Sequence, residues 1–509
     1  MLTQLLHDRL RTWARSKPSQ IALRDSQQQL SYQALWELLS QLAERFNQEP
    51  RYRLGLLASN SVQWVLIDLA ATMAGRTVVP IPSFFTVAQQ QALMQDADID
   101  LLITDVASVD LLLNEQWPTA QRWSNLPGFQ VYRRDYPSIA SAAAKITYTS
   151  GSSAAPKGVC LADAQLQRVL VSIASIVPSQ LAQRHLVTMP LAVLLENIAG
   201  VWLALYLGAE VVLPSQAELG LQGSSQLNLQ QFIGCLRQHR PESLICTPQI
   251  AQVLIAATAQ QQLQASDFRF IAVGGAAIAT HLLQQAQALG LPLYQGYGLS
   301  ECASVVALNA PGQSRLGSVG RPLPHCQVRI DDEGQIWVSG NVMQGYLNQP
   351  VAPEWWSTGD LGRLDDDGYL YVQGRCSSLL ITGYGRNVSP EWIESEAASF
   401  QQWRQLLVAG DGQVGLMALI TPAAGASEVD IEQALALLNR RLPDYARLIG
   451  WLATAEPFTL ENGLLTSNGR IRRKAILQQY QPVIDDFYQR LSDSQGALSS
   501  RLDEASLSR

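Results

Sequence analysis

The chain has few cysteines, no excess of basic residues and no long uninterrupted apolar run. Its six cysteines are scattered without a CxxC pair, which argues against a zinc site or a disulfide framework and fits a reducing, cytoplasmic location. The net charge of −7 gives no reason to expect nucleic acid as a partner. Because 509 residues exceed one ordinary hydrophobic core, two or more domains are expected.

The longest apolar stretch does not favour a membrane span. It covers residues 186–214 and is interrupted by Glu196 and Asn197. A buried strand, a helix broken at Gly208 and a second strand explain this pattern better, so no membrane span is predicted. Residues 1–20 mix charges with apolar positions, which predicts an amphipathic helix rather than a signal peptide.

Short apolar runs alternate with longer amphipathic stretches through the first three-quarters of the chain. This alternation predicts parallel βαβ units in covered sheets. The expected strands cover 54–59, 77–82, 99–104, 242–248, 268–278 and 291–298. After about Asp331, Gly-rich turns separate short strands, which predicts an antiparallel section with a hairpin turn at 365–368. The predicted fold class is α/β, with a large domain of parallel-rich βα sheets and a small antiparallel β subdomain.

The same patterns predict three segments along the chain. Residues 1–375 are expected to form the large N-terminal domain, and 376–490 a small α+β domain. Residues 491–509 are Ser-rich and polar without a periodic apolar face, so a disordered or frayed tail is expected there.

One loop collects residue types that suit a polyphosphate. It contains, in order, Thr149, Ser150, Gly151, Ser152, Ser153, Ala154, Ala155, Pro156, Lys157 and Gly158. Hydroxyl donors, exposed backbone N–H groups and a lysine charge can crowd around an anion. A Walker loop requires glycine, four residues and then Gly-Lys-Ser/Thr, whereas glycine follows the lysine here. For the loop taken alone, a Ser/Gly-rich surface loop is the competing interpretation.

Further short clusters follow this loop in the sequence. They are Val273–Ala277, Gln295–Glu301, Ser357–Leu361, Gly374–Arg375 and Glu461–Arg473. The first places glycine backbone after a strand, where ligands bind in α/β sheets, but it lacks the GxGxxG spacing of a dinucleotide fold. The second sets an aromatic ring, a hydroxyl and a carboxylate on one turn, as needed to stack on a base, contact a phosphate and hold Mg²⁺. Each cluster alone also fits a buried turn, a hairpin or a solvated charge run.

With all of these motifs in this order, the chain resembles the adenylate-forming superfamily of acyl-CoA synthetases, firefly-type luciferases and peptide-synthetase adenylation domains. The resemblance extends from about Pro18 to about Lys474. It implies a reaction in which a carboxylate and ATP give an acyl-adenylate and pyrophosphate, after which a thiol takes the acyl group. It also implies ATP, Mg²⁺ and coenzyme A as cofactors and co-substrates, and a mobile C-terminal domain joined by a hinge just after Arg375.

The resemblance implies a role for each cluster. The phosphate loop would hold the β- and γ-phosphates with Lys157 as a catalytic residue, and the glycine-rich cluster would line the adenine and acyl pocket. Tyr297 would stack on adenine, Ser300 would meet the α-phosphate, and Glu301 would be catalytic and hold the metal. The implied nucleotide-binding residues are Thr149, Ser150, Gly151, Ser152, Ser153, Lys157, Gly274, Gly275, Ala276, Tyr297, Gly298, Ser300 and, at the ribose, Asp360 and Arg375.

The chain departs from the family pattern at several positions. Ala154 replaces the second glycine of the phosphate loop, and Ser377-Ser378 replace a Lys-Asp pair at the hinge. Arg470 stands where the family has the lysine that bridges the substrate carboxylate and the α-phosphate, so it is the predicted catalytic cation. Arginine keeps the charge but is longer and forked. Three interpretations stay open: Arg470 acts in a re-registered site, Lys474 substitutes for it, or adenylation is slow or lost.

Within the superfamily, the closer resemblance is to long-chain fatty acyl-CoA synthetases. It is based on Pro190–Glu196, Ile381–Trp392 and Glu461–Thr466. Residues 191–195 lack the Asp with which amino-acid-activating domains hold a substrate ammonium, which favours an apolar acyl chain. The leading prediction is an AMP-forming ligase that joins a medium- or long-chain fatty or fatty-like acid to CoA. The alternatives are a stand-alone ligase that loads an acyl carrier protein, and a non-catalytic adenylate- or acyl-binding protein.

Overall fold

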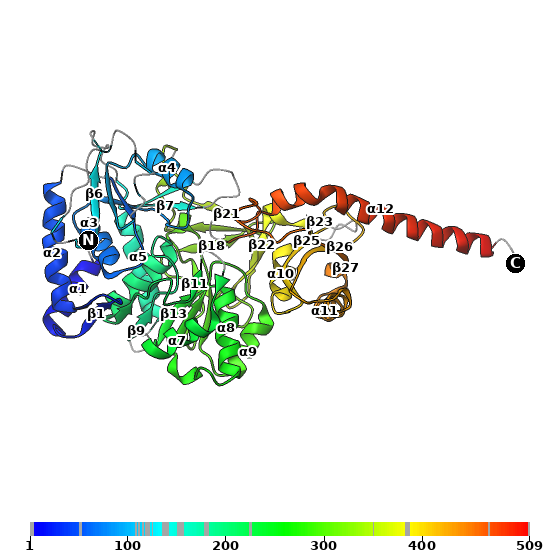
Figure 1. Ribbon diagram of the computed structural model, residues 1–509, viewed down its shortest axis with the longest axis horizontal. Helices are drawn as coiled ribbons and strands as arrows, with labels where there is room; N and C mark the ends of the chain where they lie inside the picture. Colours follow the sequence, from blue (N-terminus) through cyan, green and yellow to red (C-terminus); the bar gives the residue numbers. More distant parts are fainter. Residues whose placement is uncertain are drawn as a thin grey trace. The chain divides into compact units, whose positions relative to one another are not determined.

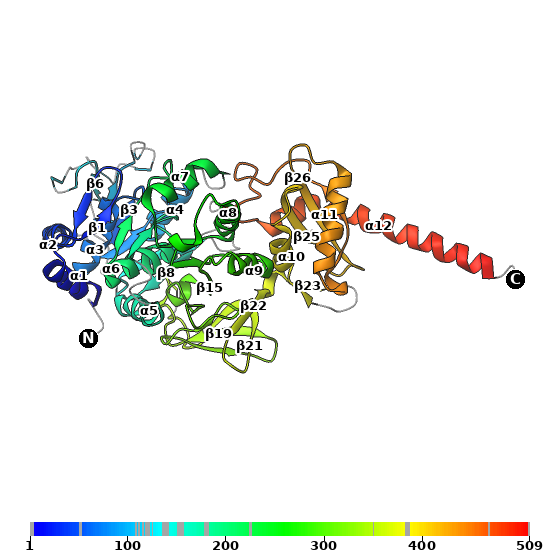
Figure 2. The same cartoon turned by 90° about the horizontal axis from the view of Figure 1, so that it is seen from below.

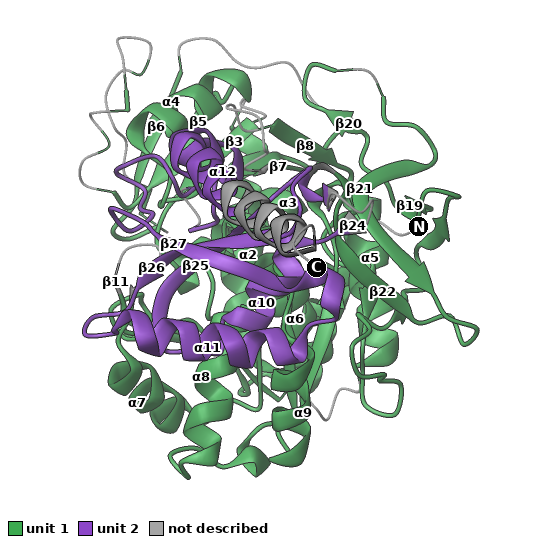
Figure 3. Ribbon diagram, turned by 90° about the vertical axis from the view of Figure 1, so that its right-hand side faces the viewer, with its two compact units in different colours: residues 1–376 green, residues 377–509 purple. Residues whose placement is uncertain are grey.

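The computed structural model describes residues 5–49, 53–106, 109, 112–113, 117, 123–124, 126–134, 142–149, 157–177, 183–222, 226–349, 351–381, 387–466 and 469–506. The chain divides into two compact units, 1–376 and 377–509, which Figure 3 colours separately. Within the described ranges, no helix is both long enough and apolar enough to cross a lipid bilayer.

Large sheets with runs of parallel strands build the first unit, as the alternating pattern predicts (Figures 1 and 2). Sheet A contains, from edge to edge, β17 (Arg321–Pro322), β16 (Ala307–Leu308), β15 (Leu293–Tyr297), β14 (Phe270–Val273), β13 (Ser243–Cys246), β9 (Arg184–Leu186), β10 (Glu210–Val212), β1 (Ile21–Arg24) and β2 (Gln29–Ser31). Sheet B contains β20 (Gly345–Tyr346), β8 (Lys157–Leu161), β7 (Lys145–Thr149), β4 (Thr77–Pro80), β3 (Arg53–Leu57), β5 (Leu101–Thr104) and β6 (Gln130–Arg133).

Parallel pairing brings two predicted site segments to one edge of sheet A. β13 pairs in parallel with β14, and β14 pairs in parallel with β15. The carboxyl ends of parallel strands lie at the same edge of a sheet, where α/β proteins bind ligands. Gly274 follows β14 and Gly298 follows β15, so both segments lie at this edge.

The helices of the first unit cover the sheets. They are α1 (Leu5–Ser16), α2 (Tyr32–Gln48), α3 (Val62–Met73), α4 (Val87–Asp96), α5 (Asp163–Ile176), α6 (Leu203–Leu207), α7 (Leu229–His239), α8 (Pro248–Ala259) and α9 (Thr280–Ala288). In sheet B, Leu56 belongs to one apolar cluster and its neighbour Leu57 to another, as the period of two in a strand requires. The sheet is therefore covered on both faces, which explains its continuous apolar runs.

The apolar stretch 186–214 folds as the strand, helix and strand that the sequence predicts. β9 ends at Leu186 and β10 begins at Glu210, and Gly208 ends the helix between them with a φ of 82°. The first part of that helix, η3 (Leu195–Trp202), is π-helical and continues into α6. An element that is apolar on nearly every side is buried inside a protein core, and η3 has this environment.

A small antiparallel sheet completes the first unit. It contains β18 (Gln327–Ile330), β19 (Gln335–Ser339), β21 (Trp356–Leu364) and β22 (Leu370–Arg375). The β21–β22 hairpin turns at the predicted Asp-Asp-Asp-Gly segment, where the N–H of Gly368 donates to the carbonyl of Asp365 over 2.9 Å. The mixed architecture confirms the predicted fold class, including the antiparallel β subdomain.

The second unit is an α+β domain around a sheet that is buried on both faces. Its sheet contains β25 (Trp403–Ala409), β26 (Leu416–Pro422) and β27 (Leu448–Ala453). The helices are α10 (Pro390–Ala397), α11 (Glu428–Arg441) and α12 (Arg473–Ser506), beside a β23–β24 pair (Leu380–Ile381 and Asn387–Val388). Val408 packs with residues of α10 and α11, whereas its neighbour Leu407 packs with residues of α12. Helices on opposite faces thus explain why β26 is almost wholly apolar.

The C-terminal segment differs from the frayed tail that the sequence predicts for 491–509. α12 continues through Ser506. Residues 491–506 contain good helix formers such as alanine, leucine, arginine and glutamate and have no proline. A helix already nucleated by packed residues such as Ile476 and Tyr480 can extend through such a segment, because propagation costs far less than nucleation.

We expect His325 to make the stability of the first unit depend on pH. Its Nε2 lies 3.0 Å from the carbonyl oxygen of Val305, and burial lowers the pKa of the imidazole to about 4, against the opposing effect of that carbonyl. In the unfolded chain the imidazole of His325 takes up a proton near pH 6.5, whereas in the folded chain it stays neutral until about pH 4. The free energy of unfolding therefore decreases as the pH falls from about 6.5 to about 4. For His325→Gln, we expect this loss to shrink by about 2–3 kcal/mol. Urea unfolding at neutral pH and at acidic pH measures the change, and an unaltered pH slope would contradict it.

Candidate functional site

The side chains of Tyr297, Asp360 and Arg375 meet at the carboxyl end of β15. The Tyr297 hydroxyl donates to Oδ2 of Asp360 over 2.6 Å, and Nε of Arg375 lies 2.9 Å from Oδ1. Asp360 and Arg375 are directly opposite each other across the β21–β22 pair. The Arg375 side chain is 53% exposed and the Asp360 side chain 8% exposed, so the guanidinium covers an inward-facing carboxylate.

Backbone contacts hold this cluster in place. The hydroxyl of Thr358 donates to the carbonyl of Ile336 over 2.8 Å and accepts the N–H of Asp360 over 3.0 Å. Nη1 of Arg375 donates to the Thr358 carbonyl over 3.0 Å. Burial, followed by the Asp360 charge, raises the pKa of Tyr297 well above its ordinary value, so its hydroxyl stays protonated and donates.

A second cluster joins Glu301 and Lys157 through Tyr346. Oε1 of Glu301 accepts the Tyr346 hydroxyl over 2.8 Å, and Nζ of Lys157 lies 5.1 Å from the centre of the Tyr346 ring. Burial, followed by the Glu301 carboxylate, raises the pKa of Tyr346. Sequence patterns do not indicate a role for Tyr346, because its position depends on the pairing of β20 with β8, and no local pattern predicts that pairing.

The glycine-rich loop after β14 lies beside the start of η3. A Cβ on Gly274 would be 3.5 Å from Cδ2 of Leu195, and Gly275 has a φ of 82°, a conformation that favours glycine. Gly275 and Ala276 are exposed. This loop and the start of η3 therefore lie side by side at the carboxyl edge of sheet A.

The turn after β15 requires glycine and presents the next two predicted residues. A Cβ on Gly298 would lie 1.7 Å from the carbonyl oxygen of Ser304, so no other residue fits without rearrangement. Ser300 and Glu301 follow in a short 3₁₀ turn, η5 (Ser300–Cys302), and both are half-buried. Tyr297, Ser300 and Glu301 thus all lie on one short segment of the chain.

Strand pairing brings the two ends of the phosphate loop together. Thr149, the last residue of β7, pairs with Lys157, the first residue of β8, in an antiparallel ladder. The predicted residues between them, Ser150, Gly151, Ser152 and Ser153, lie outside the described residues, as does Ala154.

Arg470 lies on a hairpin of the second unit. Its N–H donates to the hydroxyl of Thr466 over 3.0 Å, and its carbonyl accepts the Thr466 N–H over 2.7 Å. Arg473 anchors the following helix: its Nη2 lies 2.5 Å from Oε1 of Glu394 and its Nη1 donates to the Val408 carbonyl over 2.8 Å. Arg470 and Lys474 are both exposed, so the second unit presents a cation at each of the two predicted positions.

Glu301 suits a metal ion that arrives with ligands of its own. In those parts of the chain, no group of three His, Cys, Asp or Glu side chains is placed to hold a metal ion. Glu301 offers a single carboxylate. Mg²⁺ commonly binds through one or two carboxylates together with substrate phosphates, so Glu301 fits a nucleotide-bound Mg²⁺.

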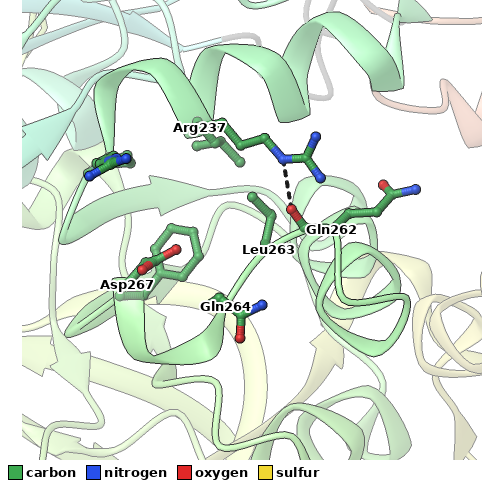
Figure 4. A pocket seen from close by; sticks show the side chains of 9 residues that line it. Arg237, Gln262, Leu263, Gln264 and Asp267 are labelled. Atoms are coloured by element: carbon green, nitrogen blue, oxygen red, sulfur yellow. Dashed lines mark hydrogen bonds between the residues drawn. The ribbon is translucent and has the colours of Figure 1, made fainter.

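A surface cavity lies at the opposite edge of sheet A from this site. It encloses about 510 Å³ and is lined by Leu236, Arg237, Arg240, Pro241, Gln262, Leu263, Gln264, Asp267 and Phe268. Figure 4 shows Arg237 donating from Nε to the Gln262 carbonyl, over 2.9 Å. These residues precede β13 and β14, so they lie at the amino ends of strands whose carboxyl ends meet the glycine-rich loop. The cavity is therefore separate from the candidate site.

Known protein families and individual proteins resemble this chain in sequence. The family model described as AMP-binding enzyme matches residues 10–347, and the one described as AMP-binding enzyme C-terminal domain matches 378–492. The long-chain-fatty-acid–CoA ligase FadD15 of Mycobacterium bovis is 23% identical, over 86% of this chain and 88% of its own length. The 2-succinylbenzoate–CoA ligase of Bacillus velezensis is 26% identical, over 85% of this chain and 91% of its own.

A solved structure shares the fold. The o-succinylbenzoate coenzyme A synthetase MenE of Bacillus subtilis, solved in complex with AMP, matches with a TM-score of 0.71 and 22% identity, over 93% of this chain and 97% of MenE. The matches confirm the resemblance drawn from the ordered motifs. The chain belongs to the AMP-binding enzyme family, within the adenylate-forming superfamily.

Proposed function

We propose that the protein is an AMP-forming acid–thiol ligase, which activates a carboxylic acid with ATP and Mg²⁺ and transfers the acyl group to coenzyme A. The observation that carries the proposal is the Tyr297–Asp360–Arg375 cluster beside a glycine-rich loop at the carboxyl edge of sheet A. Relatives that match nearly the whole chain are named as CoA ligases, which supports the same activity.

The first step forms an acyl-adenylate. A carboxylate oxygen of the acid attacks the α-phosphorus of ATP, a P–O bond forms, the bond to the bridging oxygen breaks, and pyrophosphate leaves. Lys157 neutralises the outer phosphates, Asp360 accepts ribose hydroxyls, and the Arg470 charge orients the acid carboxylate and the α-phosphate. A Mg²⁺ ion held with Glu301 supplies further charge neutralisation when bound.

The second step transfers the acyl group. The thiolate of coenzyme A attacks the acyl carbon, a C–S bond forms, the acyl–phosphate bond breaks, and AMP leaves. Free coenzyme A and a carrier protein both present a pantetheine thiol, so the same chemistry serves either acceptor. We propose coenzyme A, because the curated relatives described above are named as CoA ligases.

For the acid, we propose a medium- or long-chain fatty or fatty-like acid. Residues 191–195 are apolar, and Leu195 lies beside Gly274, so an acid entering here meets hydrocarbon rather than a charge. An aromatic acid is the second candidate, because one relative is named as a 2-succinylbenzoate ligase.

Acid-dependent exchange of labelled pyrophosphate into ATP tests the proposal. The acid series comprises octanoate, palmitate, benzoate and 2-succinylbenzoate, and thioester formation is then compared with coenzyme A and a holo carrier protein. We expect exchange with a fatty acid and transfer to coenzyme A. Exchange with aromatic acids alone would assign an aromatic substrate in place of a fatty acid. Transfer only to the carrier protein would make the carrier, and not coenzyme A, the acceptor. No exchange with any acid would favour an adenylate-binding protein.

A further inference from the structure

A buried polar cluster lies between η3 and β7, the strand that ends where the phosphate loop begins. None of the roles proposed above uses this cluster. Nζ of Lys145 lies 2.6 Å from Oδ1 of Asp68, and both side chains are 1% exposed. The same Nζ donates to Oδ1 of Asn197. Oδ2 of Asp68 accepts from Nδ2 of Asn197 and from Nε1 of Trp202, each over 3.0 Å. The lysine charge also lies 5.0 Å from the centre of the Trp202 ring.

Stability alone gives little reason for such a cluster. Removing a lysine and a carboxylate from water costs several kcal/mol per ion, and a well-packed apolar pair of similar volume is often as stable or more stable. Burial lowers the pKa of Lys145, against the opposing Asp68 charge, so the environment works against the charged lysine. What the cluster supplies is directional geometry, because each of its hydrogen bonds accepts one arrangement of its partners.

The cluster joins elements that hold different parts of the site. Lys145 begins β7, and the same strand ends at Thr149, where the phosphate loop starts. Asn197 and Trp202 belong to η3, which begins at Leu195 beside the glycine-rich loop. A strand is stiff over five residues, roughly 13 Å from the first Cα to the last. A displacement of η3 at Lys145 is therefore transmitted along β7.

The π-helical register of η3 is held from two sides. Glu196, next to Asn197, is fully buried: its Oε1 lies 3.0 Å from Nε2 of His185, and its Oε2 accepts the N–H of Met189 over 3.0 Å. Consecutive residues are thus bound to different parts of the core. π-Helical segments are rare, occur often at functional sites, and need such support, because a one-residue slip to α-helix would rotate one of the two side chains away.

We propose that Lys145 is a positioning residue that couples the phosphate-loop strand to the π-helical register of 195–202, and so aligns the nucleotide and the acid for adenylation. This inference rests on the proposed function for its activity readouts. Lys145 acts through the strand and the helix, without touching substrate.

The exchange of partners around Lys145 provides the test. Asp68→Asn leaves the lysine without a carboxylate, Asn197→Asp gives it two, and the double variant restores one carboxylate and one amide in swapped positions. We expect each single variant to lower the kcat of pyrophosphate exchange at least about tenfold while the Kd for ATP alone changes less than about threefold, because alignment rather than nucleotide binding is lost. The double variant is expected to recover part of the lost kcat, because the new carboxylate at position 197 accepts from Lys145, whereas the amide at position 68 has one oxygen for both Lys145 and Trp202. Glu49→Gln, in a buried ion pair with Arg133 far from these elements in the sheet, controls for general destabilisation.

Three outcomes would overturn the coupling. These are folded single variants with an unchanged kcat, a folded double variant that shows no recovery, and a loss in Glu49→Gln as large as in the single variants. If the single variants do not fold, Trp202→Phe is the milder change, because it removes one hydrogen bond to Asp68 and keeps an aromatic ring at this position. It is expected to lower kcat about two- to fivefold, and an unchanged kcat would overturn the proposal.

Amide hydrogen exchange separates this inference from the proposed function. ATP is expected to slow exchange in 195–202 of the wild-type protein, and Trp202→Phe is expected to weaken that response. If ATP slows hydrogen exchange in 195–202 and Trp202→Phe weakens this effect, but the protein activates no acid, the proposed function is rejected and the coupling through Lys145 is kept. An active enzyme without the response would keep the function and reject the coupling.

Discussion

Replacing Arg470 with alanine is expected to lower the rate of acid-dependent pyrophosphate exchange by about 100-fold or more. The guanidinium is the charge that we assign to the acid carboxylate and the α-phosphate, and removal of one electrostatic stabiliser of a transition state costs about 10²–10³ in kcat. Because Arg470 is exposed on a hairpin, its truncation should leave the second unit folded. Steady-state exchange with saturating ATP and acid measures the effect.

Neighbouring cations provide matched controls for this prediction. Arg472 is exposed in the same segment, so Arg472→Ala should retain activity within about threefold. Arg470→Lys keeps the charge but loses the fork, and the activity it retains measures what the forked geometry contributes. A large loss in Lys474→Ala, with Arg470→Ala fully active, would transfer the role to Lys474. An inactive wild type restored by Arg470→Lys would indicate a chain whose adenylation has been lost.

Replacing Asp360 with alanine is expected to lower kcat/KM for ATP by about 100-fold. The substitution removes the proposed acceptor of the ribose hydroxyls and leaves the Tyr297 hydroxyl and the Arg375 guanidinium without the carboxylate that positions them. Loss of a charge-assisted hydrogen bond costs about 1.5–3 kcal/mol, and the released partners add to that cost. Isothermal titration with ATP and exchange kinetics at varied ATP measure the loss.

The same hairpin offers the control for Asp360. Asp367 lies at its other end, and its 59% exposed side chain pairs with Arg315 over 2.5 Å. Asp367→Ala should leave kcat/KM for ATP unchanged, since exposed ion pairs contribute about 0–1 kcal/mol. Tyr297→Phe keeps the ring but loses the hydrogen bond to Asp360, and a roughly three- to tenfold loss is expected. Full affinity for ATP in Asp360→Ala would show that this carboxylate is not part of the nucleotide site.

Much of the fold could be predicted from local patterns. Runs such as 99–104 and 242–248 are short, apolar and separated by helical periods, and each became a buried parallel strand. Side chains two residues apart in a strand and three or four apart in a helix share a face, so the period of the apolar positions reports the element directly. The C-terminal tail departs from prediction because helix propagation from a packed segment requires no apolar periodicity of its own.

The candidate site divides in the same way. Candidate residues that lie on one turn, such as Tyr297, Ser300 and Glu301, could be predicted together because they are close in the sequence. Tyr346 was missed because it reaches Glu301 from 45 residues away through the pairing of β20 with β8. Strand partners are chosen by long-range packing, which leaves little trace in a two-residue strand.

By itself, the sequence determined the order of the adenylate-forming motifs, and with it the family, because each motif needs only residues adjacent in the chain. Only the tertiary structure decided that Asp360 joins Tyr297 from 63 residues away and that Lys145 binds Asp68 and Asn197 in the core. A buried charge is stable only where its partners converge on it from separate elements. That convergence belongs to the packed fold, and no local pattern of residue types contains it.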